Sequence, residues 1–134
     1  MKIRLKRRKY NVRYIVVHTT GTRADRTFKE LDKLPYHYVI TPSGRLINLK
    51  PLQPKDGTIE IALLGGLNRW GIHADTCTGP QEDTLFNTLI LLTEAYPEAQ
   101  IAGADEMYAY GFANPGFNVR EWISEYIPAF LQVA

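Results

Sequence analysis

The sequence contains a single cysteine, Cys77, among its 134 residues. One cysteine excludes a disulfide within the chain and a cysteine cluster that could hold a metal. Threonines flank Cys77, and we interpret it as an ordinary loop thiol. Long hydrophobic runs are also lacking: the apolar run "YIVV" is shorter than the ~7–15 residues of a secretory signal core and far shorter than a membrane span. We therefore expect a cytoplasmic protein without a membrane partner.

The sequence also has little net charge, +2 at pH 7, so a nucleic-acid partner is not indicated for the chain as a whole. The basic residues are unevenly placed. Residues 1–13 hold seven of the sixteen: Lys2, Arg4, Lys6, Arg7, Arg8, Lys9 and Arg13. A charge run of this kind is most often a solvated arm, here residues 1–12, or a basic edge strand. The alternative is a patch for an acidic partner such as a nucleic acid, a wall polymer or an acidic protein face.

What is present is the composition of one globular domain, with 45% apolar and 22% charged residues and no repeat or linker over 1–134. Apolar and β-branched runs predict five strands, at 14–18, 37–40, 45–49, 58–64 and 99–102. Helical spacing predicts a short helix near 26–34, a long one at 80–96 and a last one at 119–131. Thr78 with Gln81 and Asn118 with Glu121 indicate the starts of the two longer helices. The order of elements predicts an α/β fold, a mixed central sheet of about five strands flanked by helices.

Functional groups in such sheets gather where strands end. Four positions qualify: His18, Tyr36-His37, the segment 103–105 and Asn114. The segments around these positions resemble a known family. The segments "RYIVVHTTGTR", "YHYVITPSGRL", "IEIALLGGLN", "ADTCTGPQEDTLFNTLILLTEAYPEAQIAGADE" and "NPGFNVREWI" resemble, in this order, the landmarks of the type-2 N-acetylmuramoyl-L-alanine amidases. Those zinc enzymes include small phage lysozyme-like amidases, and the peptidoglycan recognition proteins share their fold. The resemblance runs from about residue 13 to residue 127.

The resemblance implies roles for single positions. His18 stands where the family has its first zinc-binding histidine, and Tyr36 where it has a tyrosine that helps catalysis. The second zinc histidine of the family falls on Ala104, and the third ligand, usually a cysteine, falls on Asn114. A lysine that supports the transition state in many members is replaced by Phe112. One of three metal-ligand positions therefore survives, beside a vestigial catalytic tyrosine.

A catalytic zinc needs about three protein ligands and an open position for water. Alanine has no donor, and an asparagine amide is a poor zinc ligand beside thiolate or imidazole. We therefore predict that zinc, the family's cofactor, is not bound. Other possible donors by composition are His37, His73, Asp105 and Glu106. We do not expect re-formed metal binding. Successive residues of a strand point to opposite faces of the sheet, so Asp105 would need a backbone shift to replace Ala104, and His37 should point away from the face of Tyr36. The resemblance places His73 in the loop "LNRWGIHADT", which in the family is not at the metal.

The resemblance also implies a changed cleft, because the segment between His18 and Tyr36 and the segment "QPKDG" are shorter than in the family. Candidate substrate-binding residues are Thr19, Tyr36, Tyr110 and Phe112. We expect Tyr108, Tyr110 or Phe112 to pack over the region between His18 and Tyr36. The two tryptophans, Trp70 and Trp122, are interpreted as core or partly covered residues.

Three hypotheses on function follow. The first is an amidase-like domain that has lost zinc ligands and binds peptidoglycan fragments or another partner without cleaving them. The second is an active peptidoglycan amidase, cleaving the amide between muramic acid and L-alanine with a rebuilt metal site. The third is a regulatory protein-binding domain of a phage or mobile element, for which the basic arm would suit an acidic protein partner.

Overall fold

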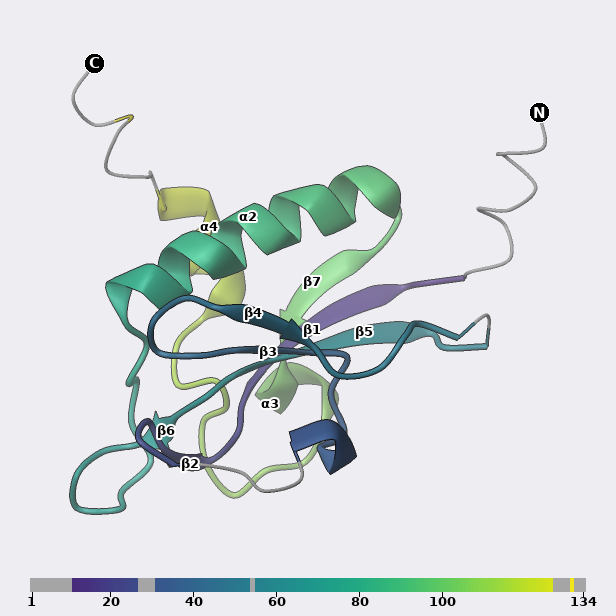
Figure 1. The fold of residues 1–134 in the computed structure, drawn as a ribbon. Helices are drawn as coiled ribbons and strands as arrows, with labels where there is room; N and C mark the ends of the chain where they lie inside the picture. The colour runs from purple at the N-terminus through teal and green to yellow at the C-terminus, as the bar shows by residue number, and fades with distance from the viewer. Residues whose placement is uncertain (1–10, 27–30, 54, 127–130, 132–134) are drawn as a thin grey trace, which may run out of the picture.

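The computed structural model describes residues 11–26, 31–53, 55–126 and 131 (Figure 1). Within them, five strands form one sheet in the order β4-β3-β5-β1-β7. Their bounds are Tyr14–Thr19 for β1, Tyr38–Ile40 for β3, Leu46–Asn48 for β4, Thr58–Leu63 for β5 and Gln100–Gly103 for β7. Neighbouring strands pair in parallel, except for β4, which is antiparallel to β3. The predicted mixed α/β sheet is confirmed.

The two most buried strands, β1 and β5, lie side by side and fix the register of the site. Val16 pairs with Glu60 and His18 with Ala62, so "YIVVH" and "TIEIALL" are neighbours as predicted. Both strands are nearly continuous apolar runs, because helices and loops cover both faces of a parallel sheet. A second, two-stranded sheet pairs β2 (Thr22–Arg23) with β6 (Gly66–Leu67) beyond the carboxyl ends of β1 and β5.

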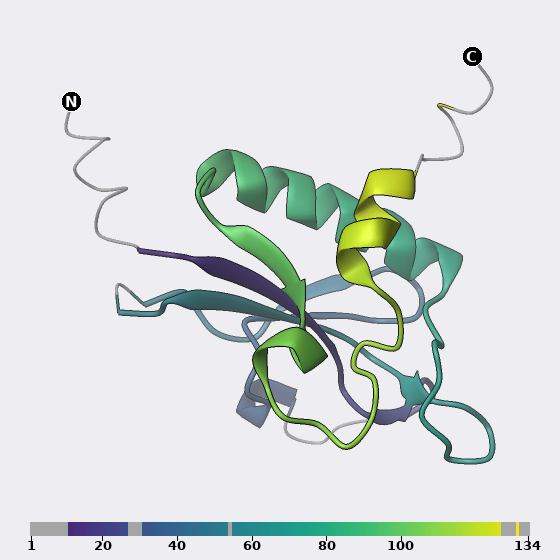
Figure 2. The same cartoon turned by 180° about the vertical axis from the view of Figure 1, so that it is seen from behind.

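Helix α2 (Gly79–Ala95) and helix α4 (Val119–Glu125) lie on one side of the sheet, and the short helix α3 (Ala104–Met107) lies on the other (Figures 1 and 2). The predicted capping box is confirmed: Thr78 Oγ1 accepts the N–H of Gln81 at 3.1 Å, and Gln81 Oε1 accepts the N–H of Thr78 at 3.0 Å. Leu85 and Leu89 on the inner face of α2 are fully buried. Burial of these leucines and the cap at Thr78 hold α2 against the sheet.

Gln81 gives the first testable prediction. Its side chain is 1% exposed, and its Nε2 donates to the carbonyls of Ile40 and Leu64 at the ends of β3 and β5. Gln81→Leu leaves both carbonyls and the Thr78 N–H without these partners, so we expect it to lower the free energy of unfolding by about 1–3 kcal/mol. Urea unfolding measures the change. Glu94→Gln, an exposed change in the same helix, is the control, and equal midpoints for the two variants would contradict the prediction.

Some expectations need correction or lie outside the described residues. The helix expected near 26–34 appears only as a 3₁₀ turn, η1 (Leu31–Lys33), and residues 27–30 are not described. Helix α4 ends at Glu125, while residues 127–130 of its predicted range are not described, nor are residues 1–10 of the basic arm. Trp122 is partly buried as expected. The expectation for Trp70 was wrong: it is 68% exposed, at the tip of a turn closed by side-chain bonds of Asn68.

Candidate functional site

The site lies at the carboxyl end of β1, where His18 is 5% exposed. Its ring Nε2 lies 2.5 Å from Oε1 of Glu60 on the neighbouring strand β5. Alternation along β5 places Glu60 on the same face as Ala62, the residue paired with His18. The carboxylate therefore reaches the imidazole from within the sheet, and the two form a buried pair.

Three side chains donate to the Glu60 carboxylate. Besides His18, the hydroxyl of Thr58 donates to Oε2, and the hydroxyl of Tyr108 donates to the same oxygen at 3.0 Å. Burial raises the pKa of Glu60, but the hydrogen bonds from His18 and Thr58 outweigh it, so that the pKa lies below its ordinary value. The carboxylate is thus held ionised in the interior. Within the described part of the chain, the other ring nitrogen of His18, Nδ1, is buried without a hydrogen-bond partner.

Two tyrosine rings pack against His18. Tyr108, which follows α3, stacks on the imidazole with ring centroids 5.8 Å apart and planes at 21°. The Tyr36 ring is tilted against the imidazole, and their centroids lie 5.0 Å apart. The expectation that the 108–112 loop packs over this region is confirmed by Tyr108. Burial, with the charge of Glu60 added, raises the pKa of Tyr108 to about 12. Burial also raises the pKa of Tyr36, so both phenols stay protonated and act as hydrogen-bond donors near neutral pH.

Asn114 has a structural role in the same place. Its side chain is 3% exposed, and its Oδ1 accepts the backbone N–H of Thr19 at 2.8 Å. Its backbone carbonyl accepts the N–H of Asp105 at 2.9 Å, and its own N–H donates to Asp105 Oδ2 at 3.3 Å. Asn114 therefore ties the end of β1 to the start of α3. The amide oxygen that a metal would need is already engaged.

The second expected ligand position, Ala104, is fully buried at the first residue of α3. Val17 pairs with Gly103, so the chain places Ala104 beside His18 at the ends of β1 and β7. The sequence thus predicted correctly which elements converge here. At the position that the resemblance assigns to the second zinc ligand, the chain thus has an alanine methyl group without a donor atom.

The other candidate donors are engaged elsewhere. His37 Nε2 pairs with Asp56 Oδ2 at 3.1 Å, and His73 stacks on Phe112 with ring centroids 3.6 Å apart. Glu106 accepts the N–H of Gly103 at 2.9 Å and pairs with Arg120. Over the residues that the structure describes, no three His, Cys, Asp or Glu side chains are grouped so as to hold a metal ion.

The residues at the three ligand positions do not fit a catalytic zinc. Zinc needs about three donors that are free to point at one centre. His18 Nε2 is held by a carboxylate, and Asn114 Oδ1 accepts a backbone N–H, while Ala104 supplies no donor. Within the described residues, His18 Nδ1 is the one buried side-chain nitrogen at these three positions without a hydrogen-bond partner, and a single donor does not hold a catalytic zinc.

Glu60 is the residue that sequence reasoning missed. A single acidic residue within the apolar run "TIEIALL" was the available signal, because a buried carboxylate is rare unless it is paired. Its partner is 42 residues away in the sequence, so only the parallel register of β1 and β5 identifies it.

No protein-family model and no curated protein matches the sequence. Solved structures do. The chain is similar to the endolysin amidase LysCS of Clostridium intestinale URNW, with 21% identity over 95% of this chain and 88% of that one and a TM-score of 0.68. It is similar to the Ph2119 endolysin of Thermus scotoductus MAT2119 bacteriophage Ph2119, with 22% identity, 87% and 88% coverage and a TM-score of 0.62. PGRP-SA of bumblebee matches at 14% identity, 88% and 85% coverage and a TM-score of 0.56.

These likenesses establish the class of fold. The five-stranded mixed sheet with its flanking helices is the fold of the N-acetylmuramoyl-L-alanine amidases and of PGRP-SA, as the sequence resemblance implied. At this level of identity they show the fold alone.

Proposed function

We propose that this chain is an amidase-like domain that binds peptidoglycan fragments without hydrolysing them. The observation that carries the proposal is the shortage of metal donors at His18, Ala104 and Asn114. Hydrolysis of the muramoyl–alanine amide in this fold requires a metal-activated water, and these positions offer one free ring nitrogen, His18 Nδ1, beside an alanine methyl group and an amide oxygen that accepts the Thr19 N–H. The similarity to endolysin amidases and to PGRP-SA favours peptidoglycan as the ligand class.

The residues around His18 differ in how far they are available to a ligand. Thr19, expected to contact substrate, is 6% exposed, and its N–H and carbonyl are bonded to Asn114 and Tyr36. Tyr108 and Tyr110 are 42% and 38% exposed, and they differ in their contacts: Tyr108 stacks on His18, whereas the Tyr110 ring lies 5.3 Å from the Phe112 ring. We therefore assign ligand contact to Tyr36, Tyr110 and Phe112, and expect the affinity to be weak because Tyr108 already covers His18.

The experiment is a calorimetric titration of muramyl tripeptide into the parent protein, with mass spectrometry of the mixture after long incubation. We expect weak binding and no released peptide. Tyr110→Ala should weaken binding while unfolding stays unchanged, because its ring lies at the surface. Tyr108→Ala is the matched variant and should lower stability more than binding, since it removes the ring and hydroxyl that contact His18 and Glu60. Release of the peptide, or no binding by the parent, would overturn the proposal.

A further inference from the structure

A tight turn after β6 projects from the body of the molecule, away from α2 and the sheet (Figure 1). Asn68 builds it: its Oδ1 accepts the N–H groups of both Trp70 and Ile72 at 3.0 Å. The Asn68 N–H donates to the Ile72 carbonyl at 2.9 Å, and Gly71 supplies the positive φ of 75° that closes the turn. These bonds fix the turn without help from another element.

The tip of this turn is apolar. Trp70 is 68% exposed and Ile72 is 61% exposed, although each would be expected to avoid water if a covering element were available. The stack of His73 on Phe112 joins the base of the turn to the 108–112 loop. Two large apolar side chains are therefore presented on a rigid support, which lowers the conformational entropy lost when they are covered.

Two arginines accompany the apolar tip. The guanidinium carbon of Arg69 lies 4.3 Å from the Trp70 ring centroid, and Arg23 Nη2 lies 3.9 Å from where a Cβ on Gly71 would stand. A shallow hollow of about 350 Å³ lies between the turn and β2, with Arg23, Arg69 and Asp25 among its lining residues. No ion pair joins either arginine to Asp25 within the residues described.

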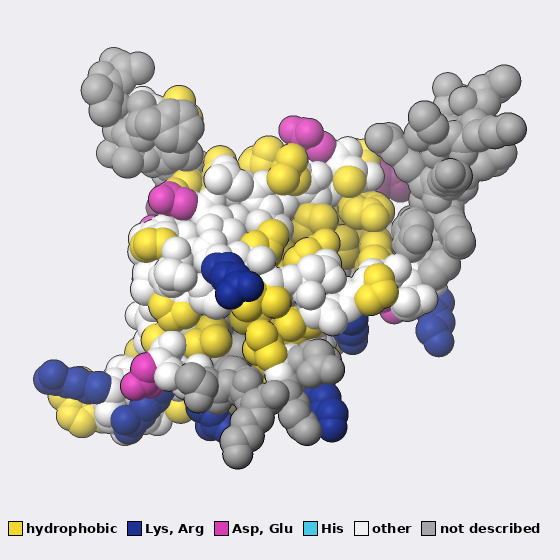
Figure 3. Space-filling view, in the orientation of Figure 1, with side chains coloured by type: hydrophobic (Ala, Val, Ile, Leu, Met, Phe, Trp, Pro, Cys, Tyr) yellow, Lys and Arg dark blue, Asp and Glu magenta, His cyan; other side chains and the backbone are white. Residues whose placement is uncertain are grey.

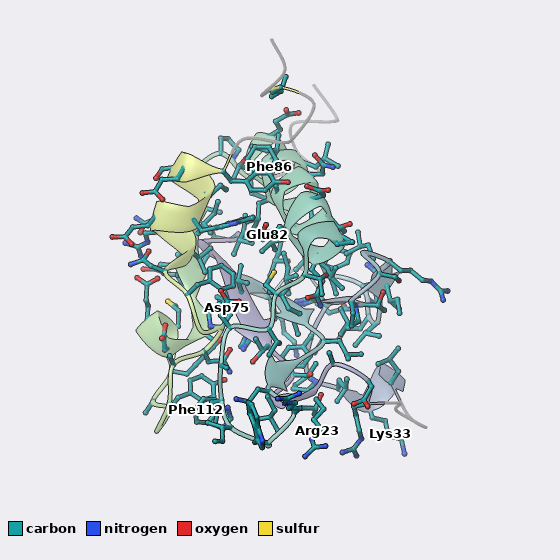
Figure 4. All side chains as sticks on the ribbon, turned by 90° about the vertical axis from the view of Figure 1, so that its left-hand side faces the viewer. Arg23, Lys33, Asp75, Glu82, Phe86 and Phe112 are labelled. Atoms are coloured by element: carbon teal, nitrogen blue, oxygen red, sulfur yellow. The ribbon has the colours of Figure 1, made fainter. Side chains whose placement is uncertain are left out.

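The figures show the same grouping. Basic and hydrophobic side chains lie together at the lower left corner in Figure 3. In Figure 4, Arg23 and Phe112 lie at one end of the molecule and Phe86 of α2 at the other. The turn and its arginines thus form a convex corner remote from α2.

We propose that this corner, Arg23 with Arg69–Ile72, docks on an anionic bilayer surface. The indole of Trp70 and the side chain of Ile72 enter the interface, where an amphipathic ring is favoured, and the two guanidiniums pair with lipid phosphates at the hollow. Shape favours this occupant over a saccharide, because small ligands are held in concave sites with converging polar groups, whereas a protruding tip suits a flat, deformable surface.

This contact needs no membrane-spanning segment. No helix in the described part of the chain is long and apolar enough to cross a bilayer, and the expectation of no membrane partner rested on spanning segments alone. The inference rests on the turn rather than on the residues around His18, so it is independent of the proposed peptidoglycan binding.

The test is co-sedimentation of the whole protein with phosphatidylcholine vesicles that do or do not contain phosphatidylglycerol, together with tryptophan emission. We expect binding to the anionic vesicles only, with a blue shift from Trp70, since the other tryptophan, Trp122, is already partly buried. The double variant Trp70→Ala with Ile72→Ala should bind the anionic vesicles at least about tenfold more weakly than the parent. Arg23→Gln with Arg69→Gln should remove the preference for anionic lipid.

Leu91→Ala is the matched control, because Leu91 on α2 is 67% exposed and lies away from the corner. It should bind vesicles like the parent. Equal binding by the Trp70 and Ile72 double variant would overturn the proposal and assign any binding to other parts of the chain. So would absence of binding by the parent. A change in Trp70 emission with a chitooligosaccharide instead of vesicles would show that the turn is a saccharide platform.

Discussion

The double variant Ala104→His with Asn114→Cys is expected to bind zinc with roughly micromolar affinity or tighter, while the parent shows none. The reason is geometric. The fold already brings the ends of β1 and β7 and the 114 position together around His18, so the two changes restore an imidazole and a thiolate to places where the parent has a methyl group and an engaged amide. His18 can supply its third ligand through Nδ1, which has no hydrogen-bond partner within the described residues, while Glu60 stays on Nε2.

Single variants serve as controls for this repair. Each single variant, Ala104→His or Asn114→Cys, has only two zinc ligands, the new residue and His18. Its zinc affinity should therefore be at least about a hundredfold weaker than that of the double variant. Thermal unfolding with and without zinc gives a second readout, since a ligand that binds only the folded state raises its stability. A folded double variant without zinc affinity would contradict the placement of these three positions around one centre.

Glu60→Ala is expected to lower the free energy of unfolding by about 3–5 kcal/mol, because it leaves three donors without their acceptor and each buried donor without a partner costs about 1–3 kcal/mol. The change leaves the His18 ring facing an empty space and takes the acceptor from the hydroxyls of Thr58 and Tyr108. Guanidinium unfolding measures the loss. Tyr108→Phe, which removes only one hydroxyl, should cost no more than about 1.5 kcal/mol.

A double-mutant cycle separates this pair from general damage. His18→Ala and Glu60→Ala should together cost much less than the sum of the single changes, because the second change removes a group already left without its partner. Additive losses would mean that the short contact between the imidazole and the carboxylate does not stabilise the protein.

The sequence predicted the elements better than it predicted their contacts. The apolar run of β1 and the capping box at Thr78 are local signals, so strand and helix were found within one or two residues of their bounds. The grouping of candidate residues around His18 could be predicted, because those residues follow the ends of neighbouring strands. The carboxylate that engages His18 could not be found in this way, because its identity depends on the parallel register between two distant segments.

For Trp70, the sequence analysis predicted a covered side chain and the structure shows an exposed one. A large aromatic residue in a short sequence is most often covered, and composition offers no sign that Asn68 would fix a projecting turn. The two side chain–backbone bonds that expose Trp70 are visible only once the chain reverses at Gly71. Exposure of an apolar residue thus depended on local turn geometry that periodicity does not report.

The proposed non-catalytic role depends on zinc not binding at His18, Ala104 and Asn114. The most direct measurement is a zinc titration of the parent protein, purified without chelator and assayed for bound metal first. We expect less than about one-tenth equivalent of zinc in the purified protein and no saturable binding at micromolar concentrations. One equivalent of zinc, bound near-micromolar or tighter and lost on His18→Ala, would contradict it.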